Sequence, residues 1–219
     1  MTGFTDYWAK KIIDHTTGKT AIGSAPTSYV ALFTAVGADD ATGFTEVTGG
    51  SYARVATAGA DWNAASGSAP SSTTNANAIT FPTSSGSWGT VIAFGLYDAS
   101  TTGNLLAWDY LGNFSWLPAT VSSASPGVIT AKAHGFSVSD SVVFTTEYGG
   151  AAPTFSSSNF TGLLVVAHAA TDTFDVTNSA TPVNTSSTGS GMVRKVSSQA
   201  IASGITAVFN SSALTITSA

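Results

Sequence analysis

Short segments in which apolar and small polar residues alternate, separated by turn-forming residues, dominate this chain. A period of two places successive side chains on opposite faces of a strand. Residues 29–34 read as a buried strand, which a polar turn at residues 37–40 closes. Further candidate strands cover residues 52–58, 78–81, 89–98 and 104–110, and residues 205–217 as a closing hairpin of the same sheet. Strands and turns without intervening helical periodicity predict an all-β fold, an antiparallel β-sandwich of the jelly-roll or Ig-like type.

A short N-terminal helix is predicted over residues 4–15, with Gly18 as its stop. Its apolar residues recur at spacings of three and four. They define a candidate attachment surface made of Phe4, Tyr7, Trp8 and Ile12. Two large aromatic rings on so short a helix indicate docking onto an apolar surface, either the chain's own sheet or a neighbouring subunit.

The middle of the chain has the pattern of a separate small β module. It ends in a Ser-, Thr- and Gly-rich stretch, and its candidate strands are residues 128–133, 141–146, 163–169, 173–177 and 192–196. Closure entropy grows only slowly with loop length, so an insertion of this kind is tolerated at a surface loop. We therefore expect a discontinuous sandwich domain, residues 1–118 plus 197–219, that carries residues 119–196 as an inserted module.

The chain is poor in charge. Only 9% of its 219 residues are charged, with 7 Lys plus Arg against 12 Asp plus Glu. The scattered cations argue against a nucleic-acid partner, and the lack of cysteine excludes disulfides and thiolate metal sites. The first residues do not have the apolar run of a signal peptide, and the longest apolar run, residues 163–170, is too short for a membrane span. We expect a soluble chain with no membrane partner.

Patterns typical of catalytic and metal sites are weak. Residues 18–20 end like a phosphate-binding loop but have no glycine at the required earlier position. His134 and His168 are interpreted as unrelated structural histidines; the alternative is a metal site or an acid–base pair. Residues 39–40 and 172–175 are interpreted as polar turns rather than calcium sites. We predict no catalytic residue, no cofactor and no metal.

Arg54 is the one strong cation between residues 20 and 132, and it lies within a strand pattern. Arginine is rarely buried without an anionic partner, because its guanidinium group is always charged. We expect Arg54 to form an ion pair with Glu46 or Asp98, in preference to binding a ligand.

Several ordered blocks of the chain resemble a family of small tailed-bacteriophage proteins, described as tail-fibre or minor virion proteins. The blocks are residues 29–35, 45–54, 81–82, 88–91, 94–99 and 103–106. In this family a helix similar to residues 7–15 precedes the first strand, and a strand similar to residues 213–216 ends the chain. The inserted module departs from the family, and residues 129–136 and 171–176 are similar to small β modules of phage tail and adhesin-like proteins.

The resemblance implies a non-enzymatic structural protein of a tailed-phage virion, assembled in the host cytoplasm. We expect a tail or fibre-associated component that attaches through its sandwich and helix and projects the inserted module. The alternative is a capsid-decorating (cement) protein that stabilises the phage head. An enzyme such as a glycan depolymerase is a third hypothesis, which the scattered carboxylates disfavour. Expected partners are other phage structural proteins, in a homo-oligomer or symmetric array on the particle, and a host-surface glycan is a further candidate.

Overall fold

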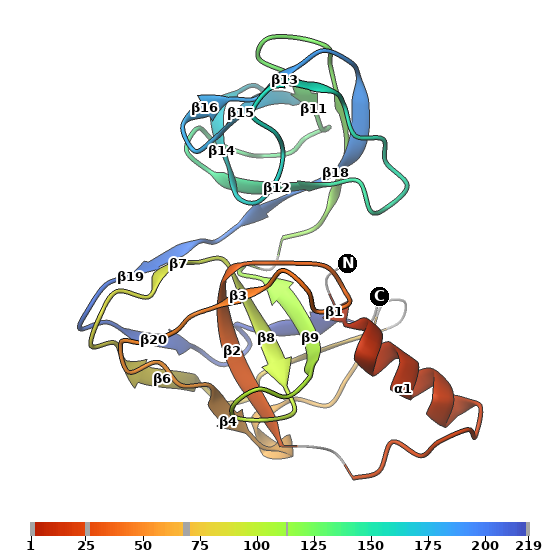
Figure 1. The fold of residues 1–219 in the computed structure, drawn as a ribbon, viewed down its shortest axis with the longest axis vertical. Coiled ribbons are helices and arrows are strands. Elements are labelled where there is room, and N and C mark those ends of the chain that lie inside the picture. The colour runs from red at the N-terminus through yellow and green to blue at the C-terminus, as the bar shows by residue number, and fades with distance from the viewer. Residues whose placement is uncertain (1–2, 25–26, 68–70, 113, 218–219) are drawn as a thin grey trace. The chain divides into compact units, whose positions relative to one another are not determined.

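The structure, a computed structural model, describes residues 3–24, 27–67, 71–112 and 114–217. It divides into two compact units: unit 1 comprises Met1–Asn113 and Ser198–Ala219, and unit 2 comprises Phe114–Ser197 (Figure 1). One α-helix occurs among the described residues, and the paired strands there are antiparallel throughout. The predicted all-β, antiparallel fold is confirmed.

The main sheet of unit 1 has the strand order β1-β9-β8-β2-β3, and β4 also pairs with β2. Its middle strands lie side by side in Figure 1. The strands are β1 (Gly3–Phe4), β2 (Ser28–Ala35), β3 (Thr45–Glu46), β4 (Val55–Thr57), β8 (Ala93–Tyr97) and β9 (Leu105–Tyr110). Both faces of β2 are buried at its centre, which explains why residues 30–33 form a continuous apolar run.

Three two-stranded ladders complete unit 1, and each joins the C-terminal segment to a strand within residues 72–91. The pairs are β7 (Gly89–Val91) with β19 (Gln199–Ile201), β6 (Ile79–Thr83) with β20 (Thr206–Phe209), and β5 (Ser72–Thr74) with β21 (Thr215–Thr217). The closing hairpin predicted over residues 205–217 is therefore wrong, because β20 and β21 pair with different strands and not with each other.

Asn75 explains why the C-terminal segment does not fold back on itself. Its buried side chain donates hydrogen bonds to the carbonyl oxygens of Asn77, at 2.8 Å, and Asn210, at 2.7 Å. It also accepts one from the backbone N–H of Leu214 at 2.8 Å, and its own backbone carbonyl accepts one from Ser212. These hydrogen bonds satisfy backbone groups of the turn at residues 210–214 and hold it against Asn75. The strands on either side of the turn, β20 and β21, pair with different strands.

One hydrophobic core serves the main sheet and the ladders. Val30, Leu32 and Phe94 from the main sheet belong to the same buried cluster as Phe81 and Ile216 from the ladders. The alternation of buried and exposed positions along β6 follows from this packing on one face.

The predicted N-terminal helix exists, but it starts later than expected. Helix α1 spans Asp6–Thr16, while Phe4 lies in β1 opposite Ala107. Gly18 adopts a φ of 72°, and the N–H groups of Gly18 and Lys19 donate to carbonyls of the last helical turn. This is the Schellman arrangement, in which glycine is favoured because it has no Cβ. The predicted helix stop is confirmed.

Unit 2 contains a closed ring of strands. Its sheet has the order β11-β10-β18-β12-β14-β15-β16, and β11 also pairs with β15, which closes six of the strands into a barrel. The strands are β10 (Leu117–Val121), β11 (Ile129–Thr130), β12 (Ser141–Thr145), β14 (Leu164–Ala169), β15 (Thr173–Asn178), β16 (Thr181–Pro182) and β18 (Gly189–Val196). A further pair is β13 (Phe155–Ser157) with β17 (Asn184–Thr185). Side chains such as Ile129, Val142 and Leu164 fill the interior.

Gly191 offers a direct test of barrel packing. A Cβ atom at this position would meet the backbone carbonyl oxygen of Thr145 and the ring of Phe144. We expect Gly191→Ala to lower the free energy of unfolding by about 1–3 kcal/mol, because a packed interior cannot absorb the added methyl group without backbone shifts. Urea unfolding of the full chain measures this change. Gly59→Ala is the matched control: Gly59 has open space around it, and unchanged stability of both variants would contradict this packing.

Candidate functional site: a neutral groove on unit 2

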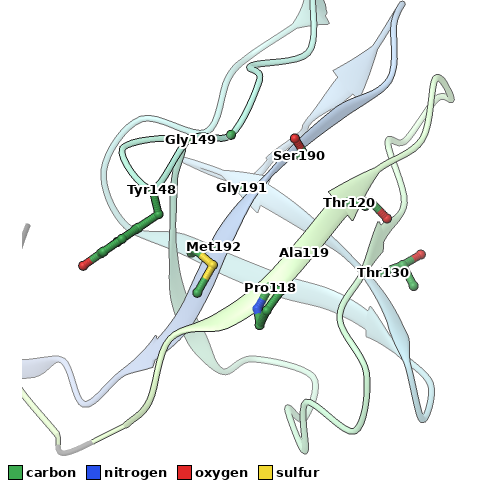
Figure 2. Close-up of a pocket in the computed structure, with 10 residues that line it drawn as sticks. Pro118, Ala119, Thr120, Thr130, Tyr148, Gly149, Ser190, Gly191 and Met192 are labelled. Carbon is green, nitrogen blue, oxygen red and sulfur yellow. The ribbon is translucent and has the colours of Figure 1, made fainter. Parts of the chain in front are cut away.

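A groove of about 500 Å³ lies on the outer surface of the unit 2 barrel. Four segments form it: β10, β11, the turn after β12, and β18 (Figure 2). Its lining residues are Pro118, Ala119, Thr120, Thr130, Tyr148, Gly149, Gly150, Ser190, Gly191 and Met192. Thr120 of β10 is paired with both β11 and β18, and Met192 of β18 with both β10 and β12, so backbone pairing holds the floor of the groove at these two positions.

Strand register places three hydroxyl groups in one row across the floor. Thr120 is the pairing partner of Thr130 on β11 and of Ser190 on β18. Paired residues of neighbouring strands lie side by side on the same face of a sheet. Pro118 and Met192 form the next pair on this face, two residues along each strand. A row of three hydroxyl groups, the hydroxyl row, therefore lies beside the apolar pair Pro118 and Met192, which we call the apolar step.

The turn at residues 146–150 forms one wall of the groove. The backbone N–H of Gly150 donates to the carbonyl of Thr146, and the N–H of Ser190 donates to the carbonyl of Ala151 at 2.8 Å. Gly150 allows this close approach, because a Cβ there would meet the backbone of Ser190. Tyr148 extends from this turn and is 45% exposed (Figure 2).

An aromatic pair and a buried cation support Tyr148. The ring centres of Tyr148 and Trp116 are 5.9 Å apart, and the guanidinium carbon of Arg194 lies 5.6 Å from the centre of the Trp116 ring. Arg194 itself is only 3% exposed. The two rings are tilted at 52° to each other, and the cation is attracted to the face of the Trp116 ring, so both contacts help to hold this aromatic surface in place.

The chemistry of the groove is neutral. None of its ten lining residues carries a charge, and its side chains supply hydroxyl groups and apolar carbon. Hydroxyl groups both donate and accept hydrogen bonds, while the tyrosine ring and the Pro118–Met192 step offer flat apolar contact. The groove is suited to binding, and its lining offers no acid–base pair.

The helix residues singled out in the sequence lie mainly against unit 1 itself. Phe4, Tyr7 and Trp8 are half-buried and pack on the unit 1 core, as the first of the two sequence-based alternatives expects. Ile12 is half-buried, and its neighbour Ile13 is 61% exposed. The exposed apolar surface of the helix thus lies at its C-terminal half.

The ion pair predicted for Arg54 is confirmed, with Glu46 as its partner. Nε and Nη2 of Arg54 donate to the two carboxylate oxygens of Glu46 at 2.8 and 2.6 Å. Nη1 donates to two backbone carbonyls of the loop at residues 99–102, and the guanidinium group stacks on Tyr97 at 3.4 Å from the ring centre. All these contacts fix loops and strands of unit 1, so Arg54 has a structural role.

The histidines and turn carboxylates are not assembled into a metal centre. His168 contacts Asp175 through Nδ1 at 3.0 Å, whereas Nδ1 of His134 accepts a hydrogen bond from the N–H of Phe136. Asp40 accepts two hydrogen bonds from Thr42, as expected for a polar turn. Within the described part of the chain, no group of three or more His, Asp or Glu could hold a metal ion. No described helix is long and apolar enough to cross a membrane.

Sequence reasoning missed the groove. Its residues come from four segments that are adjacent only once the barrel has closed. One local signal was present: Tyr148 stands before Gly149 and Gly150, and an aromatic residue beside two glycines in a polar stretch is typical of an exposed turn.

Tyr52 gives the ion-pair region a measurable pH dependence. Its phenol donates to Glu46 at 2.9 Å and accepts a hydrogen bond from the N–H of Leu32. Burial raises the pKa of Tyr52 well above its usual value, with the charge of Glu46 acting in the same direction. The folded state therefore holds the proton more tightly than the unfolded chain. Its stabilising effect is complete below about pH 10 and is lost as the pH rises further.

We expect the free energy of unfolding to fall as the pH increases above about 10, and to fall less steeply in Tyr52→Phe. Urea unfolding at a series of pH values from 8 to about 11 measures both slopes. Identical slopes for the two proteins would contradict the assignment to Tyr52.

Comparison with known proteins identifies the family. Residues 3–123, more than half of the chain, match the family described as podophage GP4 fiber I protein gp80. A comparison with curated proteins finds no match. Among solved structures, the phage phi92 endosialidase is similar with 18% identity and a TM-score of 0.26; the match covers 58% of this chain and 18% of that one. The resemblance to phage fibre proteins is confirmed, and the chain belongs to the podophage GP4 fiber I protein gp80 family.

Proposed function

We propose that this chain is a non-enzymatic structural component of a phage tail or fibre. The observation that carries the proposal is the family match over residues 3–123, which includes helix α1 and the whole main sheet of unit 1. The neutral groove agrees with it, because a lining without Asp, Glu, His, Lys or Arg suits binding better than acid–base chemistry.

In this proposal unit 1 attaches the chain to other virion proteins and unit 2 is presented outward. Attachment uses helix α1, where Ile12 and the exposed Ile13 extend the apolar surface that Phe4, Tyr7 and Trp8 begin. The chain occurs as a homo-oligomer or symmetric array within the virion, and the particle is assembled in the host cytoplasm. Unit 2 faces the host surface, where a glycan is the proposed partner.

We further propose that unit 1 is a two-layer sandwich, the main sheet forming one layer and the three ladders the other. The shared core supports this proposal, because residues from both sets of strands pack into one buried cluster. A two-layer body of this kind is suited to holding helix α1 on its surface.

A charge placed on the helix surface tests the attachment mechanism. We expect Ile13→Asp to reduce the amount of this chain in purified particles by about tenfold or more, because an aspartate at an apolar contact must lose its water. Quantitative mass spectrometry of particles from infected cells measures the ratio of this chain to the major capsid protein. Val138→Asp is the matched control, since Val138 is a similarly exposed aliphatic residue in unit 2. Equal incorporation of both variants would rule out attachment through helix α1.

A further inference from the structure

We infer that the groove on unit 2 is a binding site for a neutral saccharide, an inference that rests on the proposed host-facing role of this unit. The site consists of the hydroxyl row of Thr120, Thr130 and Ser190, the apolar step of Pro118 and Met192, and the exposed ring of Tyr148 (Figure 2).

The apolar parts of the groove match one face of a sugar ring. A pyranose presents C–H groups on its faces, and such a face packs against aromatic or aliphatic carbon. Tyr148 is suited to this contact, because its ring is 45% exposed and is supported from behind by Trp116 at 5.9 Å. Tyrosine loses little conformational entropy on binding, since it has only two side-chain torsions.

The hydroxyl row offers partners for the hydroxyl groups of a saccharide. Sugar hydroxyls act as donor and acceptor together, and a threonine or serine hydroxyl can take either complementary role. Three such groups lie in a line across β11, β10 and β18. The Ser190 oxygen already accepts a hydrogen bond from the N–H of Ala151 at 3.2 Å, and its own hydrogen remains to be donated to a ligand. The volume of about 500 Å³ lies in the range of small-molecule sites.

The absence of charge in the lining selects against acidic ligands. A carboxylate or phosphate is normally bound by an arginine or lysine, and none lines the groove. The guanidinium group of Arg194 in unit 2 does not line the groove: it is 3% exposed and lies 5.6 Å from the centre of the Trp116 ring. Sialylated or uronic-acid saccharides and nucleic-acid strands would therefore lack a counter-charge.

Strand pairing selects against an extended peptide. Peptides that bind to sheets usually add a strand to a free edge. In unit 2, β10 is paired with β11 and β18, β18 with β10 and β12, and β11 with β10 and β15. Thr120 at the centre of the groove is thus paired on both sides, so a peptide cannot add a strand at this position.

The test uses the full chain on an array of neutral hexose oligosaccharides beside sialylated and uronic-acid oligosaccharides, followed by calorimetric titration of the strongest neutral ligand. We expect binding to neutral oligosaccharides only. Tyr148→Ala and Thr120→Val should each weaken binding by about tenfold, the range for one lost stacking or hydrogen-bonding group. Tyr148→Phe keeps the ring and should remain within about twofold of the natural chain.

Thr181→Val is the matched control for Thr120→Val, because Thr181 is an exposed strand threonine on β16, outside the groove. Its affinity should not change, and circular dichroism melting shows whether each variant is folded. No binding to any neutral oligosaccharide, binding to acidic ones only, or unchanged affinity in Tyr148→Ala and Thr120→Val would each overturn the inference.

The same variants separate this inference from the proposed structural role. Tyr148→Ala should be incorporated into particles at the level of the natural chain while losing its saccharide affinity. If the natural chain is present in particles but binds no neutral saccharide, the inference fails and the structural role stands. If it binds saccharide but is missing from particles, the structural role fails.

Discussion

The return of the C-terminal segment to residues 72–91 is the constraint on which unit 1 depends. Three ladders make this connection, and the segment contributes Ile201, Leu214 and Ile216 to the core. The chain passes through the whole of unit 2 before this segment appears, so unit 1 cannot complete its core until both units have been synthesised. Pairing between such distant segments is expected to fold slowly. The buried side chain of Asn75 fixes the register at the final turn.

The low content of charged residues, 9%, limits the kinds of polar contact that the protein can make. Two ion pairs in the described residues are short: Arg54 with Glu46 at 2.6 Å and Lys195 with Asp140 at 2.7 Å. Hydroxyl groups and backbone amides therefore provide most of the polar surface. The neutral groove follows from this composition: a barrel face built from threonine, serine, proline and methionine binds through shape, stacking and neutral hydrogen bonds. In the proposed role, the same composition lets unit 2 meet a host surface without strong charge repulsion.

Local sequence patterns predicted many of the strands, whereas the pairing between distant segments was not predicted. Short apolar runs bounded by turn residues predicted β2, β8 and β9 in unit 1, and similar local patterns predicted β12, β14 and β15 in unit 2, because these signals depend only on neighbouring residues. The ladder pairing, the β11–β15 closure and the hydroxyl row depend on register between distant segments, which no single stretch specifies. Asn75 was missed because a buried asparagine looks like a loop residue in sequence. The Arg54–Glu46 pair could be predicted, since an isolated arginine in a strand needs an anion.

We propose above that this chain is a structural part of a phage tail or fibre. Cryo-electron microscopy of intact particles tests this role most directly. The two units can be recognised in density by a barrel that is continuous with a second, helix-bearing β unit. The account predicts this density at the tail or its fibres, in a small number of copies set by the tail symmetry. Density spread over the capsid surface in hundreds of copies, or particles that do not contain the chain, would contradict it.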